Sequence, residues 1–488
     1  MTGVNRVLAG LKPEIVWNIF EDITRIPRPS KREEKIRQWV KQWAEAQGIG
    51  YKEDKIGNII LYKPAVPGRE HLPTLVLQGH LDMVCQKVPE SPVNFDSDPI
   101  PVIVEGGSVT ADGTTLGADN GIGVAMAMAT LIAGLEHGPL EVLLTVDEET
   151  GLTGAFQLEP GFFTGKLLLN IDGEDIGKLI ASSAGGGDTK IDLPLAFEEP
   201  ATSESGFKLS VDGLVGGHSG VDIHLPRLNA IKALVAGLKK LSAVKGFRVS
   251  SIEGGNLRNV IPRNSVGSFA VVEGKTSELT AVFEKWKEEL LDAWLKHEPG
   301  LKITLVKASV TEVISGTLTS RVIDLLSELP HGYVAFSKDF PDLVETSNNL
   351  AIVRTIGEQL EIFVSSRSAI DDELAKQRQT IKTTGERHGG IVTLMDSYPG
   401  WAPDINSPFL NYIKEEYEKL LGKGVMLRGV HGGLECGLFM RLDPGLQIVS
   451  IGPDIKDAHS PNERITIESV IKLWEVLKAI VENLEDLS

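Results

Sequence analysis

The chain has 488 residues and carries 67 acidic against 49 basic side chains, which gives a formal net charge of −18. This excess of negative charge argues against general binding to nucleic acids or to anionic membranes. Hydrophobic residues make up 42% of the chain and charged residues 24%, which is typical of a folded globular protein and excludes extended disorder.

The first part of the chain is predicted to form an α/β domain. Ser30 and Glu33 have the spacing of a helix capping box, and apolar residues then recur at helical intervals until Gly48. A buried helix is predicted over 121–135. The predicted strands before and after that helix cover residues 58–62, 74–78, 140–146 and 167–171. Strands that alternate with helices indicate a central mixed, largely parallel sheet.

The middle of the chain, residues 187–397, is predicted to be an inserted α+β domain. Two similar stretches, GNLRNVI at 255–261 and SNNLAIV at 347–353, each precede a predicted strand and helix. The insertion is therefore either two similar halves or two unrelated strand–helix units. After the insertion, an apolar strand over 446–451 and a closing helix from Ile467 resemble the strands and helices of the first part. We expect residues 1–186 and 398–488 to form one domain around the insertion.

Histidines and carboxylates stand where predicted apolar elements begin or end. Those that follow strands, or start the buried helix, are His80, Asp82, Asp119, Glu148, Glu149, Asp172 and His459. Each alone is more often a structural histidine, a solvated turn or a helix cap. Ligands of open α/β sheets, however, bind beyond the carboxyl ends of the strands, so these groups can share one crevice. Two histidines and three carboxylates suit two Zn²⁺-like ions, with one carboxylate able to bridge them.

Two pairs in this set have a predicted geometry. His80 and Asp82 are two residues apart, so on an extended segment both point the same way, and Asp82 can accept the spare imidazole N–H. Glu148 and Glu149 are adjacent and would point oppositely on a strand. They can share a site only if the chain turns there, which Thr150-Gly151 makes plausible.

Five segments of the chain resemble the successive motifs of the di-zinc peptidase family of carnosinases, aminoacylases and related dipeptidases. They read LQGHLDMV, TLGADNGIGVAMAM, EVLLTVDEETGLTGA, LLLNIDGED and SIGPDIKDAHSPNERI. The segments GGHSG, GGNLRNVIP, YPGWAPDINSP and HGGLECGLF are similar to the branch of that family that cleaves dipeptides, including Xaa-His of the β-Ala-His type. The resemblance implies a zinc-peptidase catalytic domain with an inserted lid domain.

The resemblance also implies a role for each residue of the set. His80 and Asp172 match the terminal ligands of one zinc, and Glu149 and His459 match those of the other. Asp119 matches the bridging carboxylate, and its peptide bond to Asn120 is cis in relatives. Glu148 matches the general base for attack by a metal-bridging water, and Asp82 the residue that orients His80. Two Zn²⁺ ions are the implied cofactors, with Mn²⁺ or Co²⁺ as substitutes.

Residues of the insertion and of the HGGLECGLF segment are implied to bind the substrate. His218 matches a histidine that helps to hold the oxyanion, and Arg367 resembles an arginine that grips the free carboxylate of a dipeptide; a surface ion pair is the alternative for Arg367. Asn256 either lines the substrate path or stabilises a turn. His431 and Glu435 are expected at the amine end of the substrate.

The predicted activity is therefore hydrolysis of dipeptides. An N-acyl-amino-acid deacylase or carboxypeptidase of the same fold is the first alternative, and a non-catalytic metal or peptide binder is the second. The resemblance leaves open a monomer whose insertion covers its own site and a homodimer in which His218 acts across the interface. Two cysteines, no signal-peptide pattern and no apolar run longer than 15 residues predict a cytoplasmic protein.

Overall fold

The computed structural model describes residues 6–422 and 424–485, which form two compact units. The first unit contains the described residues up to Ser182, then Pro403–Gly429, and the described chain from Leu434 onward. The second contains Ser183–Ala402 and Val430–Gly433. Residues 1–5, the start of the segment in which no signal-peptide pattern was found, lie outside the described part. Within that part, no helix is both long and apolar enough to cross a membrane.

The first unit is built on a mixed sheet with the strand order β1-β2-β6-β3-β7-β23-β8-β22. In that order the strands are β1 (Gly50–Glu53), β2 (Ile59–Lys63), β6 (Leu140–Thr145), β3 (Leu75–His80), β7 (Leu167–Asn170), β23 (Gln447–Ser450), β8 (Lys178–Ser183) and β22 (Met426–Val430). The four central strands β6, β3, β7 and β23 are parallel. Every residue of β3, β6 and β7 is buried, as expected for parallel strands covered on both faces. The predicted α/β fold with a largely parallel central sheet is confirmed.

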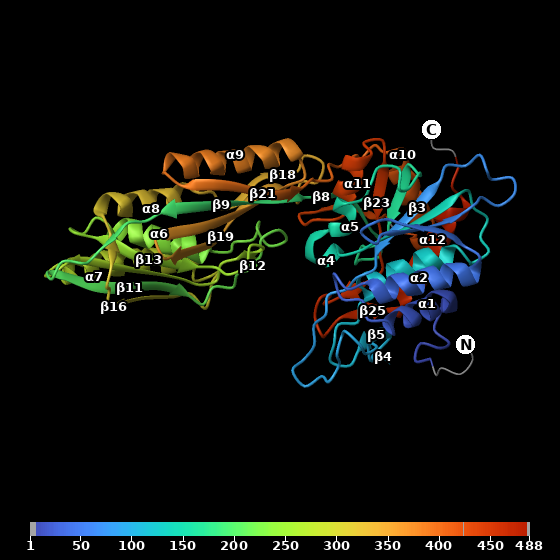
Figure 1. Cartoon of the computed structure of the whole chain (residues 1–488), viewed down its shortest axis with the longest axis horizontal. Helices are drawn as coiled ribbons and strands as arrows, with labels where there is room; N and C mark the ends of the chain where they lie inside the picture. Colours follow the sequence, from blue (N-terminus) through green and yellow to red (C-terminus); the bar gives the residue numbers. More distant parts are fainter. Residues whose placement is uncertain (1–5, 423, 486–488) are drawn as a thin grey trace. The chain divides into compact units, whose positions relative to one another are not determined.

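Helices cover this sheet. They are α1 (Glu14–Thr24), α2 (Glu34–Gln47), α3 (Ala118–Thr130), α4 (Glu148–Gly151), α5 (Thr153–Phe156), α10 (Pro408–Leu421), α11 (Cys436–Leu442) and α12 (Ile467–Glu482). The largely apolar α3 packs on β3 and β6, and α1 packs on α3. Figure 1 shows α1 and α2 on the same side of β3. A small separate sheet is formed by β24 (Ile455–Lys456), β25 (Arg464–Thr466), β5 (Ser108–Ala111) and β4 (Val102–Glu105).

Two local predictions were wrong. The helix predicted over 121–135 ends at Thr130, because the chain turns after Leu131, while Leu131 and Leu135 stay buried. Its predicted start agrees with the backbone, since Asp119 and Asn120 have non-helical φ and ψ angles. The capping box was also wrong, since neither side chain caps α2. Ser30 instead donates to Asp82, and Glu33 accepts the backbone N–H groups of Lys31 and Asp147.

The second unit holds an antiparallel sheet with the strand order β16-β11-β15-β13-β19-β20-β9-β21, and β18 pairs with β19. The strands are β9 (Gly185–Pro194), β11 (Glu204–Asp212), β13 (Arg248–Gly254), β15 (Ser265–Val272), β16 (Lys302–Lys307), β18 (Gly332–Phe336), β19 (Val344–Ile356), β20 (Gln359–Ser368) and β21 (Ile391–Tyr398). Short ladders join β10 (Phe197–Glu198) to β17 (Val313–Ile314) and β12 (Gly217–His218) to β14 (Val260–Ile261).

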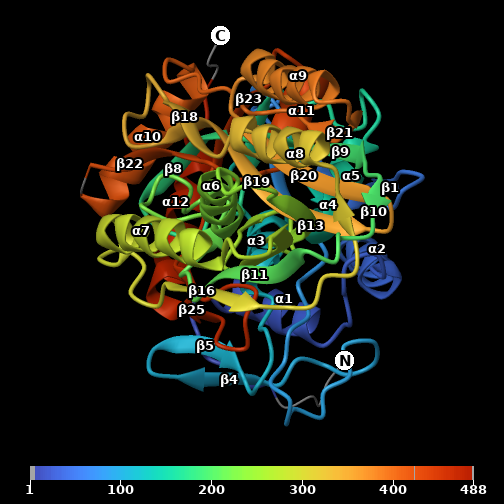
Figure 2. The same ribbon diagram turned by 90° about the vertical axis from the view of Figure 1, so that its left-hand side faces the viewer.

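The sheet of the second unit has two halves with the same strand order. Its helices are α6 (Ala230–Leu241), α7 (Thr276–Trp294), α8 (Gly316–Glu328) and α9 (Asp371–Arg387). In one half, the strands β11, β13, β15 and β16 lie side by side in the order β16-β11-β15-β13. In the other half, β9, β19, β20 and β21 lie in the order β21-β9-β20-β19. In both halves the fourth strand in the chain lies beside the first, followed by the third and then the second. This repeat supports the predicted internal doubling. Figure 2 shows α6 between α7 and α8, which it contacts.

Candidate metal centre

His80 is the last residue of β3, in the middle of the parallel strands. Its Nε2 lies 3.1 Å from Asp119 Oδ1 and 3.4 Å from Asp172 Oδ1. Asp172 follows β7, the neighbour of β3, so adjacent parallel strands deliver both residues to one edge of the sheet. A Cβ on Gly79 would lie 2.3 Å from Asn120 Oδ1, so glycine is required there for the helix start to approach β3.

Asp119 faces two histidines at once. Its Oδ1 lies 3.1 Å from His80 Nε2, and its Oδ2 lies 3.0 Å from His459 Nε2. The Asp119–Asn120 peptide bond is cis, as the resemblance implies. The Nδ2 of Asn120 donates to the carbonyl of Ile171 at 2.6 Å, which ties this turn to the end of β7 next to Asp172.

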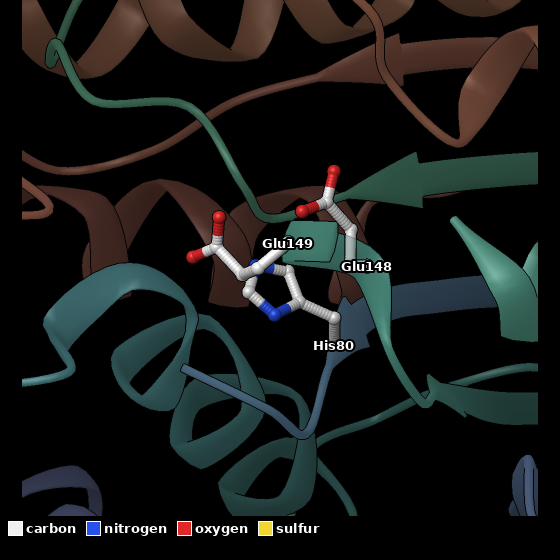
Figure 3. A group of neighbouring side chains, drawn as sticks. All are labelled: His80, Glu148 and Glu149. Atoms are coloured by element: carbon white, nitrogen blue, oxygen red, sulfur yellow. The ribbon is translucent and has the colours of Figure 1, made fainter. Parts of the chain in front are cut away.

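Glu148 and Glu149 sit on a turn at the end of β6. Asp147 has φ 52°, and its carboxylate accepts the hydroxyls of Thr150 and Thr153, so the chain leaves the strand and enters the short helix α4. The turn brings both glutamates next to His80, with one ligand atom from each of the three residues within 4.8 Å of the others. Figure 3 shows the two carboxylates beside the imidazole. Glu149 also lies 3.0 Å from His459 Nε2.

Asp82 is fully buried and joins this turn to His80. Its Oδ1 lies 3.4 Å from His80 Nδ1 and accepts the backbone N–H of Glu148 at 3.0 Å. Its Oδ2 accepts the backbone N–H of Glu149 at 3.2 Å and the hydroxyl of Ser30 at 2.8 Å. Asp82 therefore contacts the histidine and both neighbouring glutamates at the same time.

Negative charge is crowded at this edge of the sheet. Burial, together with the charges of Asp119 and Glu149, raises the pKa of Asp172 to about 7. Burial and the charges of Asp172 and Glu149 also raise the pKa of Glu148 well above its usual value. Hydrogen bonds to Asp119 and Glu149 raise the pKa of His459 to about 11. The folded chain thus holds protons here that a bound cation would replace.

The donor atoms fit two divalent cations. One group contains His80, Asp119 and Asp172, and another contains Asp119, Glu149 and His459; in each, the ligand atoms lie within 4.8 Å of one another. Asp119 belongs to both groups, with a different oxygen facing each histidine. The buried Oδ1 of Asp172 has no hydrogen-bond donor among the described residues. Imidazole nitrogens and carboxylate oxygens are suitable ligands for zinc and similar metals.

Glu435 lies behind this centre, directly before α11. Its Oε2 accepts hydrogen bonds from Gln78 Nε2 at 2.7 Å and Thr145 Oγ1 at 2.8 Å. Its Oε1 is buried and has no donor among the described residues. Burial, with the nearby charge of Asp172, raises the pKa of Glu435 to about 7. This buried carboxylate therefore keeps one oxygen free for a further donor.

His218 lies in the second unit, on β12. Its Nδ1 accepts the backbone N–H groups of Gly220 at 3.2 Å and Val221 at 3.1 Å. Burial and the positive charge of Arg367 lower the pKa of His218 and favour the neutral ring. A neutral imidazole that accepts at Nδ1 carries its proton on Nε2. His218 is therefore held as a hydrogen-bond donor at Nε2.

Arg367 and His431 are the other predicted binding residues of the second unit, and both are buried. Arg367 donates to the hydroxyl of Tyr398 at 3.1 Å, and among the described residues no carboxylate pairs with it. The alternative of a surface ion pair is wrong for this arginine. His431 Nε2 lies 2.7 Å from Ser347 Oγ, and burial, with Arg367 nearby, lowers the pKa of His431 to about 3. Asn256 is exposed, on the turn between β13 and β14.

Sequence reasoning missed several residues that hold the site together. Arg28, Ser30 and Glu463 are not ligands, yet each makes hydrogen bonds to a segment that carries one or more of the proposed metal ligands. The only indication in the sequence was that these residues stand near others of the site: Glu463 follows His459 by four residues, and Arg28 precedes Ser30 by two. Spacing cannot show that these side chains fold back onto the turns of other strands.

Comparisons with known proteins show the family of this chain. The family model described as peptidase family M20/M25/M40 matches residues 76–483. The chain is 38% identical to the cytosol non-specific dipeptidase of Escherichia coli (strain K12) over 98% of this chain and 99% of that one. The crystal structure of aminoacylhistidine dipeptidase from Vibrio alginolyticus superposes with a TM-score of 0.90 at 36% identity, covering 99% of both chains. A tripeptidase from Staphylococcus aureus shares the fold, with a TM-score of 0.56 at 18% identity, covering 97% of this chain and 99% of that one. The chain belongs to peptidase family M20/M25/M40.

Proposed function

We propose that this chain is a di-zinc dipeptidase that cleaves short peptides with a free carboxylate, including Xaa-His. The observation that carries the proposal is the carboxylate of Asp119, whose two oxygens each face a different histidine. A carboxylate shared in this way suits two cations held close together. The printed names of the Escherichia coli and Vibrio relatives, both dipeptidases, support the substrate class.

The chemistry divides between the cations and the residues around them. Two divalent cations, one held by His80 and Asp172, the other by Glu149 and His459, and both by Asp119, would polarise the scissile carbonyl and lower the pKa of the attacking water. Glu148 then takes the proton of that water. Its backbone N–H donates to Asp82 at 3.0 Å, which fixes the position of the residue at the end of β6. The same carboxylic acid delivers the proton to the leaving amine.

Three further groups would recognise the substrate. His218 offers an Nε2–H donor to the oxyanion of the tetrahedral intermediate, because its Nδ1 is occupied as an acceptor. Arg367, a buried cation without a carboxylate partner among the described residues, would bind the free carboxylate of the dipeptide. The free oxygen of Glu435 suits the protonated amine at the other end. His431 and Asn256 stay predictions for substrate contact.

The central test is Glu148→Ala in the purified protein. Metal analysis should give the same metal content as the wild type, because Glu148 is not one of the proposed ligands, while hydrolysis of dipeptides should fall by at least about 1,000-fold. Near-normal kcat in this variant would exclude Glu148 as the base. Complete indifference of the wild-type enzyme to chelators, with no bound transition metal, would exclude the metal mechanism itself.

The substrate class and the oligomeric state each have their own test. A panel of dipeptides, tripeptides and N-acetyl amino acids separates a dipeptidase from a deacylase or carboxypeptidase of the same fold. We also propose a cytosolic location, which the printed name of the Escherichia coli relative supports. Mixing His218→Ala with Glu148→Ala protein tests the homodimer, since regained activity requires His218 to act across an interface.

A further inference from the structure

Glu463 is a buried carboxylate, 2% exposed, that binds the main chain of the turn carrying Asp119. Its Oε2 accepts the N–H groups of Leu116 at 2.8 Å and Gly117 at 3.0 Å. Its Oε1 accepts those of Ala118 at 2.7 Å and Asp119 at 3.3 Å. Four consecutive amides therefore converge on one side chain.

The position of Glu463 is fixed by the loop that carries His459. The N–H of Glu463 donates to the carbonyl of Ser460 at 3.0 Å, so the segment after His459 turns back on itself. The carbonyl of Glu463 accepts the hydroxyl of Thr110 at 2.6 Å. The side chain thus links two loops, one with His459 and the other with Asp119, whose side chains lie 3.0 Å apart.

Arg28 binds the same turn through the carbonyl of Gly117. The guanidinium is also 2% exposed, and its Nη2 donates to the carbonyl of Gly117. Its Nη1 donates to the carbonyls of Leu81 at 3.0 Å and Asp82 at 2.7 Å, directly after His80. A Cβ on Gly117 would lie 2.5 Å from Nη2, so this close contact requires glycine.

We propose that Glu463 is a positioning residue for the metal centre, with Arg28 as its counterpart. The two side chains hold the 116–119 turn from its N–H and carbonyl sides, so that Asp119 can face His80 and His459 at once. Glu463 binds no metal itself. This inference rests on the proposed metal-dependent function, and it adds that the site is organised before any cation enters.

A purely structural role predicts a different result. A carboxylate that accepts the first amides of α3 could simply stabilise that helix start, and its loss would lower the melting temperature and nothing else. A positioning role predicts an additional loss of metal affinity, because partners that orient metal ligands typically affect affinity by about 10–100-fold.

Glu463→Gln is the first test, because the amide keeps the length of the side chain but has a single acceptor oxygen. Zn²⁺ affinity, measured by competition with a chromogenic chelator, should fall by about 10–100-fold. At saturating Zn²⁺ most of kcat should return, since the ligands and Glu148 are intact. The matched control is Glu141→Gln, on the same unit, where a carboxylate accepts the N–H groups of Thr164 at 2.8 Å and Gly165 at 3.1 Å.

Glu141→Gln should lower the melting temperature without changing Zn²⁺ affinity. If Glu463→Gln behaves in the same way, the positioning role is wrong. Failure of the wild-type chain to bind Zn²⁺ would instead overturn the proposed function, so the two failures are distinguishable.

Hydrogen exchange on the wild-type protein gives a test that needs no folded variant. The amides of residues 116–119 should be protected in the metal-free protein and change little on addition of Zn²⁺. Fast exchange without metal, followed by protection with it, would show that the cations organise the turn, and this would overturn the proposal.

Discussion

The two units place opposite charges at their candidate sites. In the first unit, the half-buried Asp172 and Glu148 and the buried Glu435 lie close enough to affect one another, and the pKa of each is raised. In the second unit, Arg367 is buried without a carboxylate partner among the described residues, and the pKa values of His218 and His431 are lowered. One site therefore gathers carboxylates beside two histidines, and the other gathers an arginine beside two histidines.

This difference indicates what each site binds. A buried charge without a partner is costly, so a fold that keeps one in place keeps it for a ligand. We propose that the acidic site binds cations, because its histidines face carboxylates that can share a metal ion with them. We propose that the basic site binds an anion, and its histidines have lowered pKa values that favour the neutral ring. In the proposed function a dipeptide would supply the anion through its carboxylate, whereas the cations would come from solution.

The largest expected effect is at Asp119, the residue shared by both metal groups. Asp119→Asn removes the charge that faces both histidines, so binding of both cations should weaken and kcat/KM should fall by at least about 1,000-fold, about 4 kcal/mol. Metal content and dipeptide hydrolysis measure this. Asp112→Asn, an exposed carboxylate seven residues earlier, is the control and should match the wild type. Retention of two tightly bound ions by Asp119→Asn would contradict a bridging role.

A smaller effect is expected at His218 in the basic site. His218→Ala removes the Nε2–H donor, so kcat should fall by about 100–1,000-fold, the range seen for loss of one oxyanion donor, while metal content stays unchanged. Steady-state kinetics and metal analysis together check this. His224→Ala, an exposed histidine on the same segment, should have little effect. A change confined to KM would point to ground-state binding instead of stabilisation of the oxyanion.

The order of the elements was readable from sequence because the central strands are apolar throughout. Residues 74–78, 140–146 and 167–171 were predicted as strands and occur as β3, β6 and β7. Parallel strands buried on both faces leave long apolar runs, and polar groups after them mark the sheet edge. The end of α3 was missed, because Leu131 and Leu135 are buried after Thr130 without being helical.

Polar contacts between residues distant in the sequence could not be predicted from the sequence. Ser30 and Glu33 looked like a helix cap, but they contact Asp82 and the N–H of Asp147, which are distant in sequence. Local spacing favours the local interpretation whenever a tertiary partner is unknown. The ligand types could be predicted from residue chemistry, whereas the side chains that hold the ligand turns in place could not.

A further test of the basic site replaces Arg367, which has no carboxylate partner among the described residues. Arg367→Lys keeps the positive charge but loses the fork of donors that suits a carboxylate, so KM for dipeptides should rise by about 10–100-fold with a smaller change in kcat. The same substitution should not affect residual cleavage of a dipeptide amide, which lacks the carboxylate. Arg354→Lys, at an arginine paired with Glu361, is the control. Equal losses on both substrates would exclude recognition of the carboxylate.

The smallest expected effect is the release of protons when cations bind to the acidic site. In the metal-free protein His459 has a pKa of about 11, so it is protonated at pH 7, and Asp172, with a pKa of about 7, is partly protonated. Cation binding requires both groups to be deprotonated, so it should release at least about one proton per chain, and affinity should fall as the pH drops below 7. Calorimetry in two buffers of different ionisation enthalpy measures the release. Zn²⁺ binding without proton release would mean that the cations enter away from His459 and Asp172.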